Sequence, residues 1–125
     1  MAKTKQAETI NGKDLREMFS AATAWLEKNA PDIDALNVFP VPDGDTGTNM
    51  LLTMRSTMGE AFRAPDRSAS GVAQAMARGA LTGARGNSGV ILSQIWRITT
   101  PPFSRHLFQR IEFLNCWMKK TIWRN

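Results

Sequence analysis

The sequence has a single cysteine and no long apolar run, and each scarcity excludes a class of protein. One thiol, Cys116, allows neither a disulfide within the chain nor a zinc site built from cysteines. No stretch of about 18 uncharged apolar residues occurs, which excludes a transmembrane helix. The first residues lead into polar sequence without an apolar segment, which argues against a secretory signal. Together these features predict a cytoplasmic protein.

The length of 125 residues suits one domain, and the composition is that of a globular protein. Hydrophobic residues make up 42% and charged residues 22%, so disorder of the whole chain is not expected. Residues 98–125 contain five basic side chains and one acidic side chain, so most of the net charge of +5 lies there. The basic character therefore says nothing about the function of the first 97 residues.

Apolar residues recur at helical spacing, and no useful length alternates with the period of a strand, so the sequence predicts an all-α fold. We expect residues 1–10 to be disordered and a first helix to run from about Gly12 to Asn29, capped by Asn11 and ended by Pro31. The expected openings of three further helices are Thr46 or Thr48, Ser68 or Ser70, and Ser88 or Gly89.

Apolar stripes on these helices indicate which faces are buried. The second helix carries Leu51, Met54, Met58 and either Ala61 or Phe62, and the third carries Val72, Met76, Gly79 and Ala80. In the proline-rich segment 31–47 we expect Leu36, Val38, Phe39 and Val41 to anchor an ordered loop in the core.

An acidic, glycine-bearing segment, NVFPVPDGDTGTNM, covers residues 37–50. Asp43 and Asp45 flank Gly44, so both carboxylates can turn toward one point, where a hard cation such as Mg²⁺ or Ca²⁺ would relieve their repulsion. Thr46, Thr48 and Asn49 follow at a helix start, whose backbone N–H groups attract phosphate. The segment predicts a site for Mg²⁺ with a nucleotide, whereas Asp34 falls outside it and its loss should do little. A solvated acidic turn is the alternative.

Other motifs with similar residues do not fit this segment. An EF-hand loop beginning at Asp43 requires Gly at 48 and Glu at 54, where the chain has Thr48 and Met54. A dehalogenase-type nucleophile motif has a different order of Asp and Gly and follows an apolar strand rather than a loop broken by prolines.

A second glycine-rich segment, GARGNSG, opens the predicted fourth helix. Arg85, the Ser88 hydroxyl and free backbone N–H groups suit contact with phosphate. The segment lacks the Gly-Lys-Ser/Thr of a Walker A loop. Alone it also fits an interhelical turn with a serine cap, and its interest lies in its pairing with the acidic segment.

Taken together, NVFPVPDGDTGTNMLLTM and GALTGARGNSGVILSQIWR closely resemble the nucleotide-binding (DhaL-type) domain of the dihydroxyacetone kinase superfamily, nearest to the N-terminal kinase domain of bacterial fatty acid kinase. The resemblance covers residues 11–97. It implies an all-α, barrel-like bundle of which this chain holds the first half, with ATP or ADP at one end and two Mg²⁺ ions between aspartates and phosphates.

The resemblance also implies roles for individual residues. Asp43 and Asp45 match the family's metal-binding aspartates, and Asn37 stands nearest to a further upstream ligand. The positions that match phosphate and nucleotide contacts are Thr46, Thr48, Asn49, Gly86, Asn87, Ser88 and Gly89, and Arg85 adds a cation to the second loop.

The implied function is an ATP-dependent kinase, of glycerone kinase or fatty acid kinase type, that transfers the γ-phosphoryl group to an acceptor. Another protein or domain would hold the acceptor, as an acyl-binding or dihydroxyacetone-binding subunit. No residue beyond the metal site is assigned to catalysis, because phosphoryl transfer depends on positioning and charge neutralisation. Nucleic acid is not an expected partner, and a homodimer is left open.

The match ends abruptly after Arg97, which indicates a truncated or frameshifted reading frame. We therefore expect uncovered apolar stripes that include Leu51, Met54, Met58, Ile91 and Ile95, and a loosely attached basic, aromatic tail over 98–125. Two alternative functions follow: an inactive fragment that at most binds nucleotide, or membrane or nucleic-acid binding through the tail. His106 and Cys116 are expected to be inert.

Overall fold

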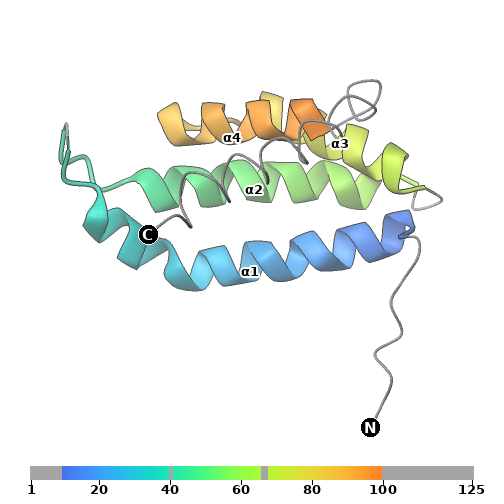
Figure 1. Ribbon diagram of the computed structural model, residues 1–125, viewed down its shortest axis with the longest axis horizontal. Coiled ribbons are helices and arrows are strands. Elements are labelled where there is room, and N and C mark those ends of the chain that lie inside the picture. The colour runs from blue at the N-terminus through green and yellow to red at the C-terminus, as the bar shows by residue number, and fades with distance from the viewer. Residues whose placement is uncertain (1–9, 40, 66–67, 100–125) are drawn as a thin grey trace, which may run out of the picture.

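A computed structural model describes residues 10–39, 41–65 and 68–99, and over these ranges the chain forms four α-helices and no strand. The helices are α1 (Gly12–Leu36), α2 (Thr46–Arg63), α3 (Ala69–Thr82) and α4 (Gly86–Thr99) (Figure 1). The prediction of an all-α fold is confirmed. The predictions for the first nine residues, and for the tail from residue 100 onward, fall outside the described residues.

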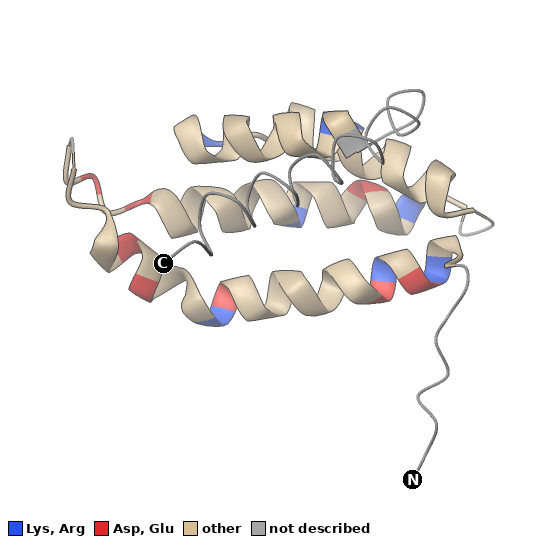
Figure 2. Cartoon of the chain, in the orientation of Figure 1, with Lys and Arg blue, Asp and Glu red and all other residues tan. Residues whose placement is uncertain are grey.

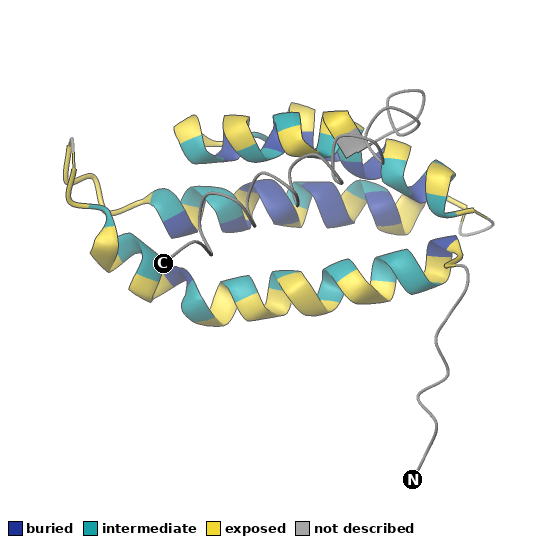
Figure 3. Cartoon of the chain, in the orientation of Figure 1, coloured by how far each residue is buried: buried dark blue, intermediate teal, exposed yellow. Residues whose placement is uncertain are grey.

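Helix α2 is the central element of the bundle and contacts each of the other three helices. Figure 1 shows it between α1 and the pair formed by α3 and α4. Its buried residues run along most of its length, as Figure 3 shows. The core cluster joins Met58 and Ala61 of α2 to Val72 and Met76 of α3, with Phe19 and Trp96 among the residues packed against it. The predicted stripes on α2 and α3 are confirmed.

Both predicted caps on α1 and α3 are present. Asn11 and Asp14 form a reciprocal capping box, in which each side chain accepts a hydrogen bond from the other residue's backbone N–H. The Ser68 hydroxyl accepts from the Gly71 N–H at 3.1 Å. These bonds satisfy amide groups that a helix leaves unpaired in its first turn, and they fix where the two helices begin.

Helix α1 is longer than predicted, because it continues through Pro31 to Leu36. Pro31 has no N–H to donate to the carbonyl of Glu27, which is why the sequence predicted an earlier end. Packing against α2 outweighs that loss: Gly47 sits so close to the last turns of α1 that a Cβ there would lie 2.5 Å from the Ala30 carbonyl oxygen. Contact between α1 and α2 therefore outweighs the tendency of Pro31 to end the helix.

Two predictions about apolar side chains are wrong. Leu36, Val38, Phe39 and Val41 do not anchor the loop between α1 and α2, because their side chains are all more than half exposed. The stripe of Leu51, Met54 and Met58 is buried, because α2 lies inside the bundle and the other three helices cover it. Ile91 and Ile95 of α4 are exposed, as predicted.

Gly79 sets the closeness of α3 and α2. A Cβ at this position would lie 2.6 Å from the Ser56 carbonyl oxygen, which is backbone and cannot easily yield. Gly79→Ala should therefore lower the free energy of unfolding by about 1–3 kcal/mol in urea denaturation. Gly59→Ala is the matched control, since nothing lies within 4 Å of its Cβ position. It should raise stability by up to about 1 kcal/mol, and equal effects of the two substitutions would contradict the close packing.

Candidate functional site

The acidic loop lies at the end of the bundle where α1 stops and α2 starts. Figure 2 shows acidic segments in the last turns of α1 and in this loop. Asp43 and Asp45 are both exposed, and Gly44 between them has a φ of +63°, a conformation that glycine adopts without strain. The Asn37 side-chain amide donates to a carboxylate oxygen of Asp45 at 3.4 Å. The loop thus brings Asn37 next to Asp45 from eight residues away.

The second glycine-rich segment, at the start of α4, lies against the first turns of α2. Gly86 has a φ of +61°, and a Cβ there would come within 2.4 Å of the Asn49 side-chain nitrogen. The Ser88 hydroxyl donates to the Thr46 carbonyl oxygen at 3.2 Å. The starts of α2 and α4, forty residues apart in sequence, are therefore direct neighbours, and Figure 1 shows both helices beginning at the same end of the bundle.

A cavity of about 370 Å³ lies between the acidic loop and these two helix starts. The residues that line it are Asn37, Val41, Asp43, Asp45, Thr46, Asn49, Gly86, Asn87 and Ser88. All except Val41 are residues that the sequence marked as candidates. Val41 was predicted to be a core anchor, and nothing in its sequence context distinguishes a residue that lines a site from one that anchors a loop.

Three other candidates do not line the cavity. Arg85 is exposed, and its backbone N–H donates to the Thr53 hydroxyl at 3.1 Å. Gly89 is buried against the same hydroxyl, which would lie 2.3 Å from a Cβ at that position. Gly89 therefore allows α4 to approach α2. Thr48, the third, is turned toward α1.

Asp34 of α1 accepts both polar groups of Thr48. The Thr48 N–H donates to one carboxylate oxygen at 3.0 Å, and the Thr48 hydroxyl donates to the other at 2.6 Å. Hydrogen bonds from the Thr48 hydroxyl and backbone lower the pKa of Asp34 below its usual value. Sequence reasoning missed this residue because it treated Asp34 as lying outside the motif.

The start of α2 also differs from the prediction, because Asp34 takes part in capping it. We expected Thr46 or Thr48 to cap the helix, but the N-cap residue is Asp45, whose side chain makes no capping bond. Asp34 supplies the acceptor instead, from the neighbouring helix. A sequence signal limited to the helix's own first residues cannot reveal a cap that comes from another helix.

The cavity's donor set suits a hard divalent cation that keeps some of its water. Over the described ranges, no group of three or more His, Cys, Asp or Glu side chains is close enough to hold a metal ion. Asp43 and Asp45 are two carboxylates at one cavity, with the Asn37 amide beside them. Mg²⁺ is typically held by one or two carboxylates together with water and substrate phosphates, so these residues fit Mg²⁺ bound with a nucleotide.

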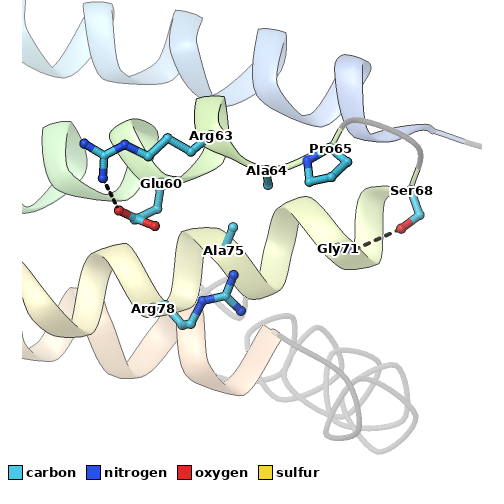
Figure 4. Close-up of a pocket in the computed structure, with 8 residues that line it drawn as sticks. All are labelled: Glu60, Arg63, Ala64, Pro65, Ser68, Gly71, Ala75 and Arg78. Carbon is cyan, nitrogen blue, oxygen red and sulfur yellow. Dashed lines mark hydrogen bonds and ion pairs between the residues drawn. The ribbon is translucent and has the colours of Figure 1, made fainter.

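A second hollow, of about 440 Å³, lies between the C-terminal part of α2 and the first turns of α3 (Figure 4). Among its polar groups, Arg63 pairs with Glu60 at 2.6 Å and the Ser68 hydroxyl caps α3. It lies at the opposite end of α2 from the acidic loop, about 25 Å away along the helix axis. None of the predicted site residues lines it, so we take the cavity at the acidic loop as the candidate site.

Comparison with known protein families shows to which family the chain belongs. A family profile described as the DAK2 domain matches residues 40–105, which is more than half of the chain. The chain belongs to the DAK2 domain family. The matched range includes most of the acidic loop, the starts of α2 and α4, and the whole of the core helix α2. DAK2 domains form the DhaL-type nucleotide-binding part of the dihydroxyacetone kinase family.

Proteins of two bacterial species are similar to this chain in sequence. Protein YloV of Bacillus subtilis (strain 168) is 52% identical over 89 residues, which are 71% of this chain and 16% of YloV. Uncharacterised proteins of Staphylococcus aureus strains USA300 and NCTC 8325 are each 49% identical over 88 residues, or 70% of this chain and 16% of their own length. The chain thus spans about a sixth of the length of these relatives. Closeness to fatty acid kinase in particular stays a prediction.

None of the described helices has both the length and the apolar character that crossing a lipid bilayer requires.

The bond between Asp34 and Thr48 makes stability depend on pH. In the folded chain the pKa of the Asp34 carboxyl group lies below the unfolded value of about 3.9, so the ionised carboxylate stabilises the fold above that pH. The stabilisation is lost as pH falls through the folded pKa. We expect the difference in free energy of unfolding between wild type and Asp34→Asn to be largest near pH 7 and to shrink below about pH 4. Urea denaturation at pH 7, 4 and 3 measures it, and a difference independent of pH would contradict the role of the ionised carboxylate.

Proposed function

We propose that this DAK2 domain binds Mg²⁺–ATP in the cavity at the acidic loop and serves the transfer of the γ-phosphoryl group to an acceptor. The observation that carries the proposal is that two carboxylates and two helix N-termini meet at one cavity. Membership of a kinase family adds support, because DAK2 domains are nucleotide-binding. Such a domain would act in the cytoplasm, where ATP is plentiful.

The helix starts supply the phosphate contacts in this proposal. The first backbone N–H groups of a helix have no partner within the helix, and the helix dipole adds partial positive charge there. The starts of α2 and α4 border the same cavity, together with the side chains of Thr46, Asn49, Asn87 and Ser88. In α2 the Thr48 N–H is already bonded to Asp34, so phosphate oxygens entering the cavity would find the remaining N–H groups of the two helix starts and these side chains.

The acidic loop supplies the charge that a metal requires. Asp43 and Asp45 would hold Mg²⁺, with Asn37 positioned beside them by its bond to Asp45. When bound, Mg²⁺ neutralises charge on the phosphates. The exposed carboxylates leave room for the phosphates themselves to complete the metal's coordination.

The phosphoryl acceptor would come from outside the described helices. The residues that line the cavity are those proposed to hold phosphate and Mg²⁺, and the relatives are about six times longer than the matched segment. An acyl-binding or dihydroxyacetone-binding subunit would present the acceptor, in keeping with the family resemblance. The second candidate is nucleotide binding without turnover, which the same lining of the cavity would support.

Removing either carboxylate should weaken binding of Mg²⁺–ATP. Asp43→Ala or Asp45→Ala should raise the Kd in isothermal titration calorimetry by roughly tenfold or more, because a ligand charge is lost. Asp32→Ala is the control, since Asp32 is exposed near the end of α1 and does not line the cavity. An equal loss in all three variants would indicate a general effect of acidic charge and contradict the metal assignment.

Turnover separates the two candidate functions. ADP release should appear only when Mg²⁺–ATP is combined with an acceptor-presenting protein, of acyl-binding or dihydroxyacetone-binding type. Phosphorylated acceptor detected by mass spectrometry would support the kinase. Nucleotide binding in calorimetry without ADP release, with either type of acceptor protein, would instead support the binding module.

A further inference from the structure

We propose that Asp34 is a positioning residue for the nucleotide site: it anchors both ends of the acidic loop and keeps Thr48 away from the phosphates. The proposal rests on the function proposed above, since it assigns a role within that site. It differs from the sequence-based assignment, in which Thr48 contacts phosphate and Asp34 is without importance.

The side chain of Asp34 fixes the loop's far end. Both carboxylate oxygens accept hydrogen bonds from Thr48, at 3.0 Å from the backbone N–H and 2.6 Å from the hydroxyl. Thr48 lies in the first turn of α2, directly after the acidic loop. A carboxylate acceptor at this position is charge-assisted, so it holds the helix start more firmly than a neutral cap would.

The backbone of the same residue fixes the loop's near end. The Asn37 N–H donates to the Asp34 carbonyl oxygen at 3.1 Å, where α1 ends. Asn37 in turn donates through its side chain to Asp45. One residue of α1 therefore bonds both to Asn37, directly after α1, and to Thr48, in the first turn of α2, and the Asn37–Asp45 contact links the two ends of the loop.

These hydrogen bonds have a consequence for phosphate binding. Thr48 uses its N–H and its hydroxyl on Asp34, and it does not line the cavity. Thr46 and Asn49, which do line it, stand on either side of Thr48 in the same helical turn. Holding Thr48 toward α1 sets the rotation of α2, and that rotation directs Thr46 and Asn49 toward the ligand.

The ligand-free test measures hydrogen exchange of backbone amides in the full chain. Asp34→Ala should speed exchange at the Thr48 amide by roughly three- to tenfold, as expected for the loss of its hydrogen-bond acceptor. The Asn37 amide donates to the backbone carbonyl of residue 34, which the substitution keeps, so its rate should change little. Asp32→Ala, two residues earlier on the same helix, should leave these rates unchanged. Amides in the core of α2, such as that of Met58, report global unfolding. A wild-type rate at Thr48 in Asp34→Ala, or equal acceleration at Met58, would overturn the proposal.

The ligand-bound test measures the Kd of Mg²⁺–ADP by calorimetry at a temperature where every variant is folded. Asp34→Ala should weaken binding by roughly three- to tenfold, and Asp34→Asn, which keeps an acceptor for the Thr48 N–H, should fall between Asp34→Ala and wild type. Thr48→Val removes the hydroxyl that donates to Asp34, so both substitutions break the same contact. The double variant Asp34→Ala/Thr48→Val should therefore bind Mg²⁺–ADP no more weakly than Asp34→Ala alone. A double variant whose loss is the product of the two single losses would overturn the proposal.

The two tests also separate this proposal from the proposed function. If wild type fails to bind Mg²⁺–ADP, the proposed function fails, while the exchange rates still decide whether Asp34 anchors the loop. If wild type binds and Asp34→Ala binds equally well, the nucleotide site stands and the positioning role is overturned.

Discussion

The candidate site depends on the first two turns of α2, because both the end of α1 and the start of α4 pack against them. The end of α1 contacts them through Asp34 and Thr48, and the start of α4 contacts them through Gly86 and Asn49. Both contacts require close approach, because side chains at Gly47 and Gly86 would collide with α1 and with Asn49 respectively. The cavity exists because these two contacts hold a loop from one side and a helix start from the other against the same helix. Glycine therefore acts at this site mainly by allowing helices to meet.

The sequence could predict features that depend on neighbouring residues. Helical periodicity located the buried stripe of α2, and the cap at Asn11 follows from its spacing to Asp14. The pairing of the two glycine-bearing segments was also visible, since both open helices. Features that depend on contact between distant residues were missed. Pro31 inside α1 and the cap that Asp34 provides for α2 arise from packing between helices, which a local pattern does not encode.

The DAK2 match and the candidate cavity involve the same segment of the chain. Family membership rests on sequence over residues 40–105, while the cavity rests on where the chain places two carboxylates and two helix starts. Asn37 and Asp34 lie before the matched range, yet they make the hydrogen bonds that link the two ends of the acidic loop. All of α1 lies before that range, so the proposed positioning role of Asp34 would make a helix outside the family match part of the site.

The central claim is that the acidic loop and the start of α4 form one nucleotide site. A titration of the ¹⁵N-labelled chain with Mg²⁺–ADP, followed by NMR, tests it most directly. The account predicts shifts at the Gly44, Asp45, Asn87 and Ser88 amides that saturate with a single Kd, while the Gly71 amide, beside the hollow at the other end of α2, stays unchanged. Shifts confined to only one of the two segments, or centred on Gly71, would contradict it.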